Sequence, residues 1–320
     1  MSFLADLRRS FLSRPGRAWP LGLVLAAAVA CGAGDPAAPR WDARAPMPEP
    51  RTEVAAATVG REIAVVGGFL ANGSSSTRAG AYSPARDSWR SLPALPVGVN
   101  HAAAAAWRGR LVVAGGYVAP GTPLRAGYVL DRGRWRALPR PPEPRAAAGA
   151  AVVGDRLYLV GGVGPAGLAR ETLVYSFVTR RWRTIPGPTP REHLAVAAVG
   201  GRVFALAGRL AGIDTNLRQL EVWTGRRWER LPPIRHARGG TGVAAVGREL
   251  VSVGGEEPGG TIASVYAYDV DRRRWRRLPD LPTPRHGLGV AAVGGRVYAI
   301  GGGTEPGLTV SDANEALTLR

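Results

Sequence analysis

The chain has 320 residues, of which 45% are hydrophobic and 21% are charged, a balance typical of a soluble globular protein. Its 42 basic residues are all arginine, they face 24 acidic ones, and the net charge is +18. No arginine-rich run is interleaved with stacking aromatic residues, so nucleic-acid binding is disfavoured. Two explanations of the charge stay open: a GC-rich genome that favours arginine, or selection for anionic partners, which arginine binds through paired hydrogen bonds.

Residues 1–30 have the pattern of an export signal. Arg8 and Arg9 precede Ser-Phe-Leu, as in a twin-arginine signal, and an apolar run follows at residues 20–30. That run has the length of a signal's hydrophobic region and is too short to span a bilayer. We therefore expect an exported bacterial protein, located in the periplasm or at the cell surface.

Cys31 is the single cysteine and follows Ala28-Val29-Ala30 directly. The segment resembles a bacterial lipobox, in which the cysteine is acylated, although Ala28 stands where leucine is usual. The alternative is ordinary cleavage after the Ala-x-Ala triplet, which leaves a free thiol. We predict lipidation at Cys31, a membrane anchor, and a flexible tether over residues 31–40.

A repeat of about 47 residues fills residues 41–320. Its first marker is a tryptophan, and the intervals between successive members are 48, 46, 47, 46 and 47 residues. The second marker is a glycine pair, which becomes Ala207-Gly208 in the fourth unit. A period of this length with several short strands predicts an all-β propeller with six blades. The tryptophans are Trp41, Trp89, Trp135, Trp182, Trp228 and Trp275.

The unit that begins at Arg145 illustrates the four antiparallel strands expected in each blade. They cover residues 145–153, 156–160, 172–177 and 182–186, and a variable loop follows Gly161-Gly162. The first strand is rich in small residues, as the crowded axis of a propeller requires. The tryptophan opens the fourth strand and is large enough to fill the space between blades.

The glycine pair, a later tyrosine and a tryptophan seven residues after it resemble the kelch repeat. The first, second, third and fifth units keep this spacing of seven residues. In the fourth unit, Trp223 stands in place of the tyrosine. Trp41 would open an outer strand before any inner strand has appeared, and the last unit ends after a third strand near residues 314–319. We therefore expect the segment at Trp41 to complete the sixth blade and close the ring, which removes exposed sheet edges.

Candidate ligand-binding residues lie where the inner strands begin. Sixteen residues before each glycine pair stands an arginine in five of six units, and Val99 takes the place in the second. Glu53, His101, Glu192, His193 and His286 lie close after these positions. We expect a ring of guanidinium groups at one mouth of the propeller, which would bind an anionic ligand or acidic protein. The alternative is that the arginines are structural and pair with glutamates. The candidate ligand-binding residues are Arg51, Arg145, Arg191, Arg238, Arg285, His193 and His286.

Metal binding and cofactors are not expected. The histidines form no known metal-binding spacing, they lie in different blades, and no cysteine of the repeat could bind a metal.

Two functions follow from these residues. The first is an exported, lipid-anchored binding module without chemistry of its own. The second rests on a distant resemblance to six-bladed periplasmic kelch proteins that interconvert the anomers of sialic acid, and it implies a mutarotase or epimerase of an acidic sugar. Its acid or base would be Glu192 or Glu53 beside the arginines.

Overall fold

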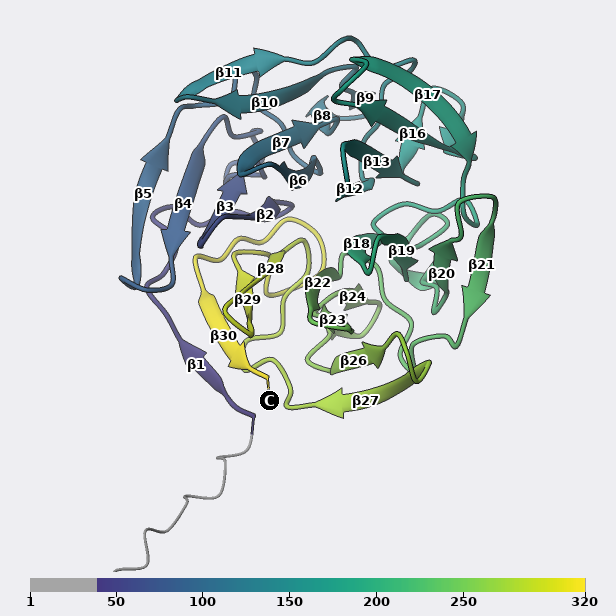
Figure 1. The fold of residues 1–320 in the computed structure, drawn as a ribbon. Helices are drawn as coiled ribbons and strands as arrows, with labels where there is room; N and C mark the ends of the chain where they lie inside the picture. The colour runs from purple at the N-terminus through teal and green to yellow at the C-terminus, as the bar shows by residue number, and fades with distance from the viewer. Residues whose placement is uncertain (1–38, 320) are drawn as a thin grey trace, which may run out of the picture. The chain divides into compact units, whose positions relative to one another are not determined.

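The computed structural model describes residues 39–319, and the expected export signal, Cys31 and most of the expected tether lie outside this range. The described chain is an all-β propeller of six four-stranded antiparallel sheets, whose inner strands gather around a central axis (Figure 1). Among residues 39–319, no helix is long and apolar enough to cross a membrane.

The first three blades follow one another along the chain. Blade 1 holds β2 (Ala55–Val59), β3 (Glu62–Val66), β4 (Ala79–Ser83) and β5 (Ser88–Leu92). Blade 2 holds β6 (Ala103–Trp107), β7 (Arg110–Ala114), β10 (Gly127–Asp131) and β11 (Arg134–Ala137). Blade 3 holds β12 (Gly149–Val153), β13 (Arg156–Val160), β16 (Glu171–Ser176) and β17 (Arg181–Pro186).

The remaining blades close the ring. Blade 4 holds β18 (Ala195–Val199), β19 (Arg202–Leu206), β20 (Leu220–Trp223) and β21 (Trp228–Leu231). Blade 5 holds β22 (Gly242–Val246), β23 (Glu249–Val253), β26 (Val265–Asp269) and β27 (Arg274–Leu278). Blade 6 holds β28 (Gly289–Val293), β29 (Arg296–Ile300), β30 (Asn314–Thr318) and β1 (Trp41–Ala43).

The predicted closure is confirmed, because β1 is the outer strand of blade 6. Trp41 pairs with Leu317 and Ala43 with Glu315 in an antiparallel register. Every strand finds its sheet partners, and the hydrophobic cores form, among residues 41–319. The propeller that begins at Pro39 is therefore a self-contained folding unit.

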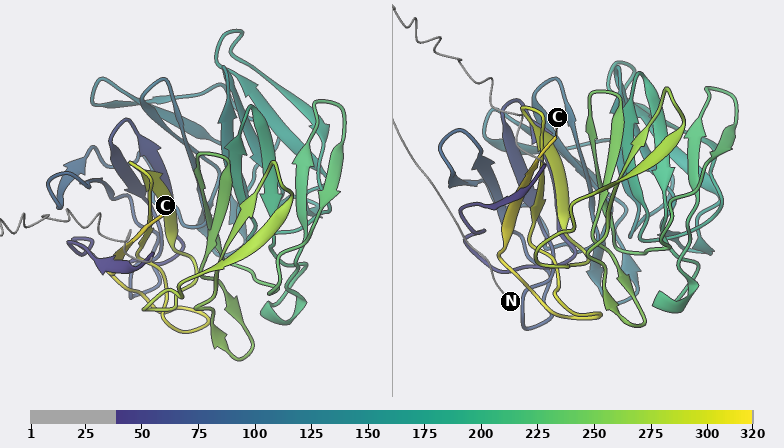
Figure 2. Two further views of the ribbon diagram at one scale, coloured as in Figure 1. Left: turned by 60° about the horizontal axis from the view of Figure 1, so that its bottom comes forward. Right: turned by 90° about the horizontal axis from the view of Figure 1, so that it is seen from below.

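The strands run between two faces of the molecule (Figure 2). The mouth face carries the beginnings of the inner strands and the glycine pairs. The turn face lies at the opposite ends of the same strands, where the two inner strands of each blade are joined by turns. These turns lie at residues 60–61, 108–109, 154–155, 200–201, 247–248 and 294–295.

The tryptophans join neighbouring blades. In blade 1, Tyr82 and Trp89 face each other across β4 and β5, which explains the spacing of seven residues. The indole of Trp89 then donates a hydrogen bond of 2.9 Å to the carbonyl of Ala45, which follows the outer strand of the preceding blade. All six repeat tryptophans make this bond; the other acceptors are the carbonyls of Pro279, Pro93, Pro139, Pro186 and Pro232.

Three loops that follow the glycine pairs contain short hairpins that the sequence did not predict. They are β8 (Tyr117–Ala119) with β9 (Thr122–Pro123), β14 (Val163–Gly164) with β15 (Gly167–Leu168), and β24 (Glu256–Glu257) with β25 (Gly260–Thr261). The equivalent loop of blade 4 contains a 3-10 turn, η1 (Ile213–Thr215). Together these loops surround the mouth.

The two glycines of a pair are under different constraints. Gly301 and Gly302 have φ of 63° and 97°, and a Cβ on Gly302 would lie 2.6 Å from the carbonyl oxygen of His286. The position equivalent to Gly301 is held by Ala207 in blade 4, at φ 55°. A Cβ on Gly301 would lie 2.9 Å from the carbonyl oxygen of Arg51, a milder conflict, and blade 4 accommodates an alanine at this first position. The second position is glycine in all six blades.

We expect Gly302→Ala to lower the free energy of unfolding by about 1–3 kcal/mol more than Gly301→Ala. The φ of 97° at Gly302 lies outside the left-handed helical region that an alanine can adopt, and the clash of its Cβ with a carbonyl oxygen is closer. Urea denaturation of the two variants measures the difference. Equal losses would show that the clash is relieved without cost.

Candidate functional site at the axial mouth

Six residues at the entries to the inner strands form a backbone ring around the axis. Each has a left-handed conformation, with φ between 49° and 63°. Five of the six amides donate to the carbonyl of the counterpart in the preceding blade at 2.9–3.1 Å, and the amide of Val54, next to Glu53, closes the ring by donating to the carbonyl of Gly287. This positive φ turns four side chains toward the axis. The ring residues are Glu53, His101, Ala147, His193, Gly240 and Gly287.

The ring surrounds a polar cup on the axis, with a volume of about 100 Å³. Glu53, His101 and His193 line it, together with Thr241 and small apolar residues of the inner strands. Pockets that enclose a whole small molecule usually measure about 300 Å³ or more. The cup is therefore large enough for one functional group of a ligand, whose remainder would stay outside.

His101 is held in one orientation by its neighbour. Asn100 Nδ2 donates to Ser75 Oγ at 2.7 Å, so Asn100 Oδ1 faces His101 Nδ1 at 2.6 Å. This arrangement assigns the proton to Nδ1 and leaves His101 Nε2 directed at Glu53 Oε2, 3.3 Å away. His101 also packs edge-on against the ring of His193, with centroids 4.7 Å apart.

Arg209 connects the carboxylates at the mouth. Its guanidinium lies 3.2 Å from Glu192 Oε1 and 2.6 Å from Glu256 Oε1, and its Nη2 donates to His193 Nε2 at 2.9 Å. Burial opposes the ionisation of Glu192, but His193 and Arg209 favour it more, and the pKa of this carboxyl is lowered. The positive charge of Arg209 is thus matched by two carboxylates.

Glu53 and His286 form a second pair behind the cup. Glu53 Oε1 lies 3.3 Å from His286 Nδ1, and His286 Nε2 faces the carbonyl of Gly307 at 3.1 Å. Burial opposes the ionisation of Glu53, but His101 and then His286 outweigh it and hold its pKa well below its usual range. Burial lowers the pKa of His286, while Glu53 and Glu256 raise it more, so the net shift is upward.

The raised pKa of His286 predicts a pH-dependent stability. A histidine whose pKa is higher in the folded than in the unfolded state stabilises the fold fully below the ordinary pKa of about 6.5. This contribution disappears as the pH rises through the folded-state value. We expect the stability difference between the wild type and His286→Gln, measured by urea denaturation, to shrink as the pH rises. A difference that does not vary with pH would contradict the assignment.

The five predicted arginines are not gathered at the mouth, and the expected ring of guanidinium groups is wrong. Their exposed fractions are 3% for Arg51, 1% for Arg145 and 0% for Arg191, Arg238 and Arg285. Each guanidinium turns back into its own blade and donates to the carbonyl of the first residue of the glycine pair, 16 residues later. The five distances are 2.5, 3.1, 2.6, 3.2 and 2.7 Å.

Three of these arginines also meet a carboxylate, as the structural alternative expected. Arg145 pairs with Glu143, Arg191 with Glu221 at 2.5 Å, and Arg285 with Glu315 at 2.6 Å. In five of the six blades, the arginine therefore ties the segment before the first strand to the end of the second strand. Their role as ligand contacts stays a prediction that needs the blades to open.

The histidines are closer together than expected. Glu53, His101 and His193 belong to blades 1, 2 and 4, yet each offers a ligand atom within 4.8 Å of the others. The expectation that separate blades keep them apart is wrong, because all six inner strands converge on the axis. Two histidines and a carboxylate are donors that zinc accepts, but His193 Nε2 already accepts a hydrogen bond from Arg209. As it stands, the cluster is a hydrogen-bonded network.

The remaining predicted residues have mixed positions. His193 lies in the cup, and His286 lies behind it with an exposed fraction of 2%. His236 lies outside the ring and pairs with Glu257 at 2.8 Å. Both candidate catalytic residues, Glu53 and Glu192, are at the mouth.

The sequence interpretation missed Arg209 and Glu256. Both residues directly follow the glycine-pair position of their blade. This position forms a β-bridge with the segment that leads into the innermost strand, as Arg209 does with Glu192 and Glu256 does with Gly239.

Comparison with known proteins agrees with the repeat. The kelch motif family model matches residues 144–189 and 237–282, which correspond to blades 3 and 5. No curated protein matches the sequence significantly.

Proposed function

Since the chain is a kelch-repeat β-propeller, we propose that it is an exported binding module that receives its partner at the mouth face. Kelch propellers generally serve as protein-interaction modules. The observation that supports this proposal is the polar cup, because a closed scaffold holds its ionised and hydrogen-bonding groups in place before a ligand arrives.

The loops around the cup extend the contact surface. Leu210 in blade 4 and Leu308 in blade 6 have exposed fractions of 46% and 52%. Exposed leucines beside a polar recess are the arrangement expected of a contact surface, in which apolar residues bury area and the recess selects one group. We propose that a protein partner rests on these loops and inserts one side chain into the cup.

The charges of the cup favour a basic side chain from the partner. Glu53 lines the recess, and Glu192 and Glu256, which lie at the mouth outside its lining, match the charge of Arg209. The anionic ligand suggested by the sequence would meet carboxylates first, because the repeat arginines lie inside the blades. An amino or guanidinium group would instead gain hydrogen bonds to charged acceptors.

A thermal-shift experiment on the propeller from Pro39 onward distinguishes these ligands. The probes are an arginine-containing peptide, a peptide of glutamate residues, a uronic acid and N-acetylneuraminic acid. Because a ligand that binds only the native state raises the melting temperature, we expect a shift with the basic peptide and its loss in Glu53→Gln. A shift with the acidic probes alone would instead restore the anionic ligand. A flat response to every probe would contradict recognition at the cup.

Export and anchoring belong to the same proposal and are tested separately. We propose that residues 1–30 direct export and that Cys31 is acylated, so that the propeller is held at a membrane in the periplasm or at the cell surface. Metabolic labelling with a fatty-acid analogue should mark the wild type and leave Cys31→Ser unlabelled. Replacement of Arg8 and Arg9 by lysine should retain the protein in the cytoplasm.

One observation favours the enzymatic alternative, a mutarotase or epimerase of an acidic sugar. Glu53 and Glu192, the candidate acid and base, each lie 3.3 Å from a histidine nitrogen at the mouth. Such pairs can exchange a proton with a sugar hydroxyl that enters the cup. Exchange spectroscopy of N-acetylneuraminic acid should then show faster interconversion of its anomers with the wild type than with Glu53→Gln. A wild-type rate equal to the rate without protein would exclude this activity for that sugar.

A further inference from the structure

The positive charge of the propeller lies mainly on one face. Each turn between the two inner strands carries an arginine within it or beside it, and together these residues form a ring on the turn face. The six residues are Arg61, Arg108, Arg156, Arg202, Arg248 and Arg296.

The turns between the third and fourth strands add further arginines on the same face. Arg180 and Arg181 lie in blade 3, Arg226 and Arg227 in blade 4, and residues 272–274 of blade 5 are three consecutive arginines. Ion pairs within 4.0 Å engage some of the turn-face arginines, such as Arg108 and Arg248. Among residues 39–319, none is found for Arg61, Arg156 or Arg226, and all three are exposed.

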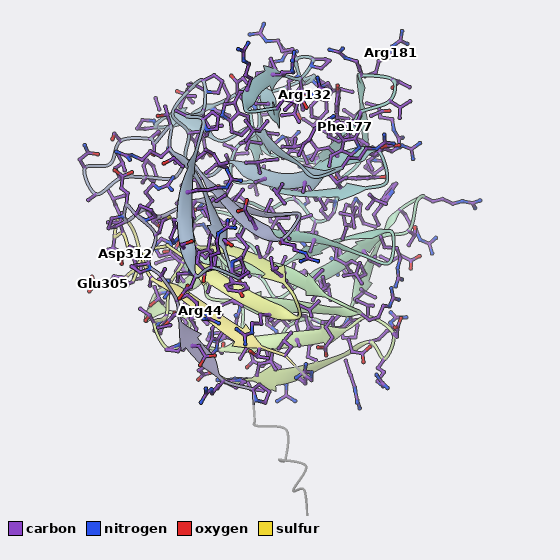
Figure 3. The ribbon with its side chains drawn as sticks, turned by 60° about the vertical axis from the view of Figure 1, so that its left-hand side comes forward. Arg44, Arg132, Phe177, Arg181, Glu305 and Asp312 are labelled. Carbon is purple, nitrogen blue, oxygen red and sulfur yellow. The ribbon has the colours of Figure 1, made fainter. Side chains whose placement is uncertain are left out.

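The mouth face is more evenly balanced in charge. Its carboxylates include Glu53, Glu192, Glu256, Glu257 and Glu305, and its repeat arginines are buried. Figure 3 shows Glu305 and Asp312 at the left edge of the molecule, Arg132 near the top and Arg181 at the upper right. The excess of arginine over acidic residues in the propeller therefore produces a stronger positive field on the turn face than on the mouth face.

An apolar spot interrupts the basic turn face. Trp107 and Phe177 stack with centroids 4.2 Å apart, and the guanidinium groups of Arg108 and Arg110 lie over the Trp107 ring. Val178, next to Phe177, has an exposed fraction of 69%. Aromatic and apolar side chains bordered by arginine are typical of surfaces that settle into lipid headgroups.

The chain enters the propeller at this same face. β1 is antiparallel to β30, and Trp41 pairs with Leu317 near the end of β30. Leu319 in turn donates to the carbonyl of Gly295, in a turn of the turn face. The residues just before β1, Pro39 and Arg40, therefore lie on the turn face.

We infer that the turn face rests on the surface of an anionic lipid bilayer, with the mouth face directed away from the membrane. The inference rests on the proposed anchoring at Cys31 only for its cellular setting, because the charge and the apolar spot belong to the propeller itself. A basic surface attracts anionic lipid headgroups whether or not an acyl chain is present.

Vesicle sedimentation with the propeller from Pro39 onward tests this inference. The vesicles are phosphatidylcholine alone or phosphatidylcholine with added phosphatidylglycerol, at an ionic strength of about 0.15 M. Each arginine near an anionic membrane contributes about a five-fold factor to partitioning. We expect binding only to the vesicles with phosphatidylglycerol, and a reduction of roughly 100-fold in the triple variant Arg61→Gln, Arg156→Gln, Arg226→Gln.

The matched control removes three exposed arginines from the mouth side: Arg140→Gln, Arg170→Gln and Arg235→Gln. Both triple variants lose the same charge, so a response to net charge alone would weaken them equally, whereas the inference predicts that the control stays within a few-fold of wild type. Unchanged melting temperatures would show that both variants are folded.

Three outcomes would overturn the inference: equal losses in the two triple variants, no binding to anionic vesicles, or binding to heparin without binding to vesicles, which would point to a polyanion. The fragment lacks Cys31, so its vesicle binding does not depend on acylation. Failure of the labelling of Cys31 would thus contradict the anchor and leave this test unaffected.

Discussion

Replacing Arg191 with methionine is expected to lower the free energy of unfolding by about 3–5 kcal/mol, the usual cost of removing one partner of a buried ion pair. The side chain is fully buried, and burial lowers its pKa despite the opposing effect of Glu221. It donates to the carbonyls of Ala205 and Ala207 at 3.1 and 2.6 Å as well as to Glu221. Methionine fills much of the volume but leaves these three acceptors without their donor.

The control for this prediction is Arg183→Met. Arg183 lies in β17 of the preceding blade and is exposed, so we expect a change within about 0.5 kcal/mol. Urea denaturation of both variants gives the comparison. If Arg191→Met were as stable as Arg183→Met, the buried arginine would not be needed for the fold, and its role as a ligand contact would regain support.

The repeat predicted the architecture because its markers are local contacts that recur in each blade. Tyr82 and Trp89 keep a spacing of seven because they face each other across one strand pair. Arg51 and Gly67 keep a spacing of sixteen because the guanidinium binds the carbonyl of that glycine. Trp41 predicted the closure for the same reason, since an outer-strand marker without an inner strand has to find one elsewhere in the chain.

The direction of the arginine side chains could not be predicted from the same spacing. An arginine at the entry of an inner strand can reach the axis or turn back into its blade, and both conformations fit the interval of sixteen residues. Which conformation the arginine adopts depends on the backbone carbonyls within its reach. In blade 3 these are the carbonyls of Gly161, after the second strand, and Glu171, at the start of the third. These acceptors belong to the backbone, so the sequence carries no sign of them.

The cup escaped prediction for a different reason. Its ring positions hold glutamate, histidine, alanine, histidine and two glycines, so the site breaks the repeat that identifies the fold. Glu53 and His193 are 140 positions apart in the chain and meet because every blade sends one left-handed residue to the axis. A non-repeating residue at a repeating position is the signal that could have indicated the site.

Removing the strand that closes the ring is expected to have the largest effect on stability. A chain that begins at Met47 lacks β1, so β30 loses its pairing partner and becomes an exposed edge. It also loses Trp41, whose indole donates to Pro279, and the bond from Arg44 to Asn314. Loss of a packed tryptophan costs about 3–5 kcal/mol, and each hydrogen bond adds about 1 kcal/mol. We therefore expect a total loss of roughly 5 kcal/mol or more.

Urea denaturation and size-exclusion chromatography compare this short chain with the propeller that begins at Pro39. An open edge strand pairs with other chains, so we expect aggregation beside the loss of stability. A short chain that stays monomeric and equally stable would show that closure by β1 is dispensable.

A rearranged chain separates the loss of the strand from the loss of its connection. β30 ends on the turn face where β1 begins, so residues 39–46 can be attached through a short linker after residue 320 in a chain that starts at Met47. The sixth blade would then be continuous and the ring would be closed by side-chain contacts between blades alone. We expect most of the lost stability to return, because the contacts of Trp41 with blade 5 and of β1 with β30 are restored. If it did not return, the covalent link between blades 6 and 1, rather than the pairing of β1, would be what holds the propeller closed.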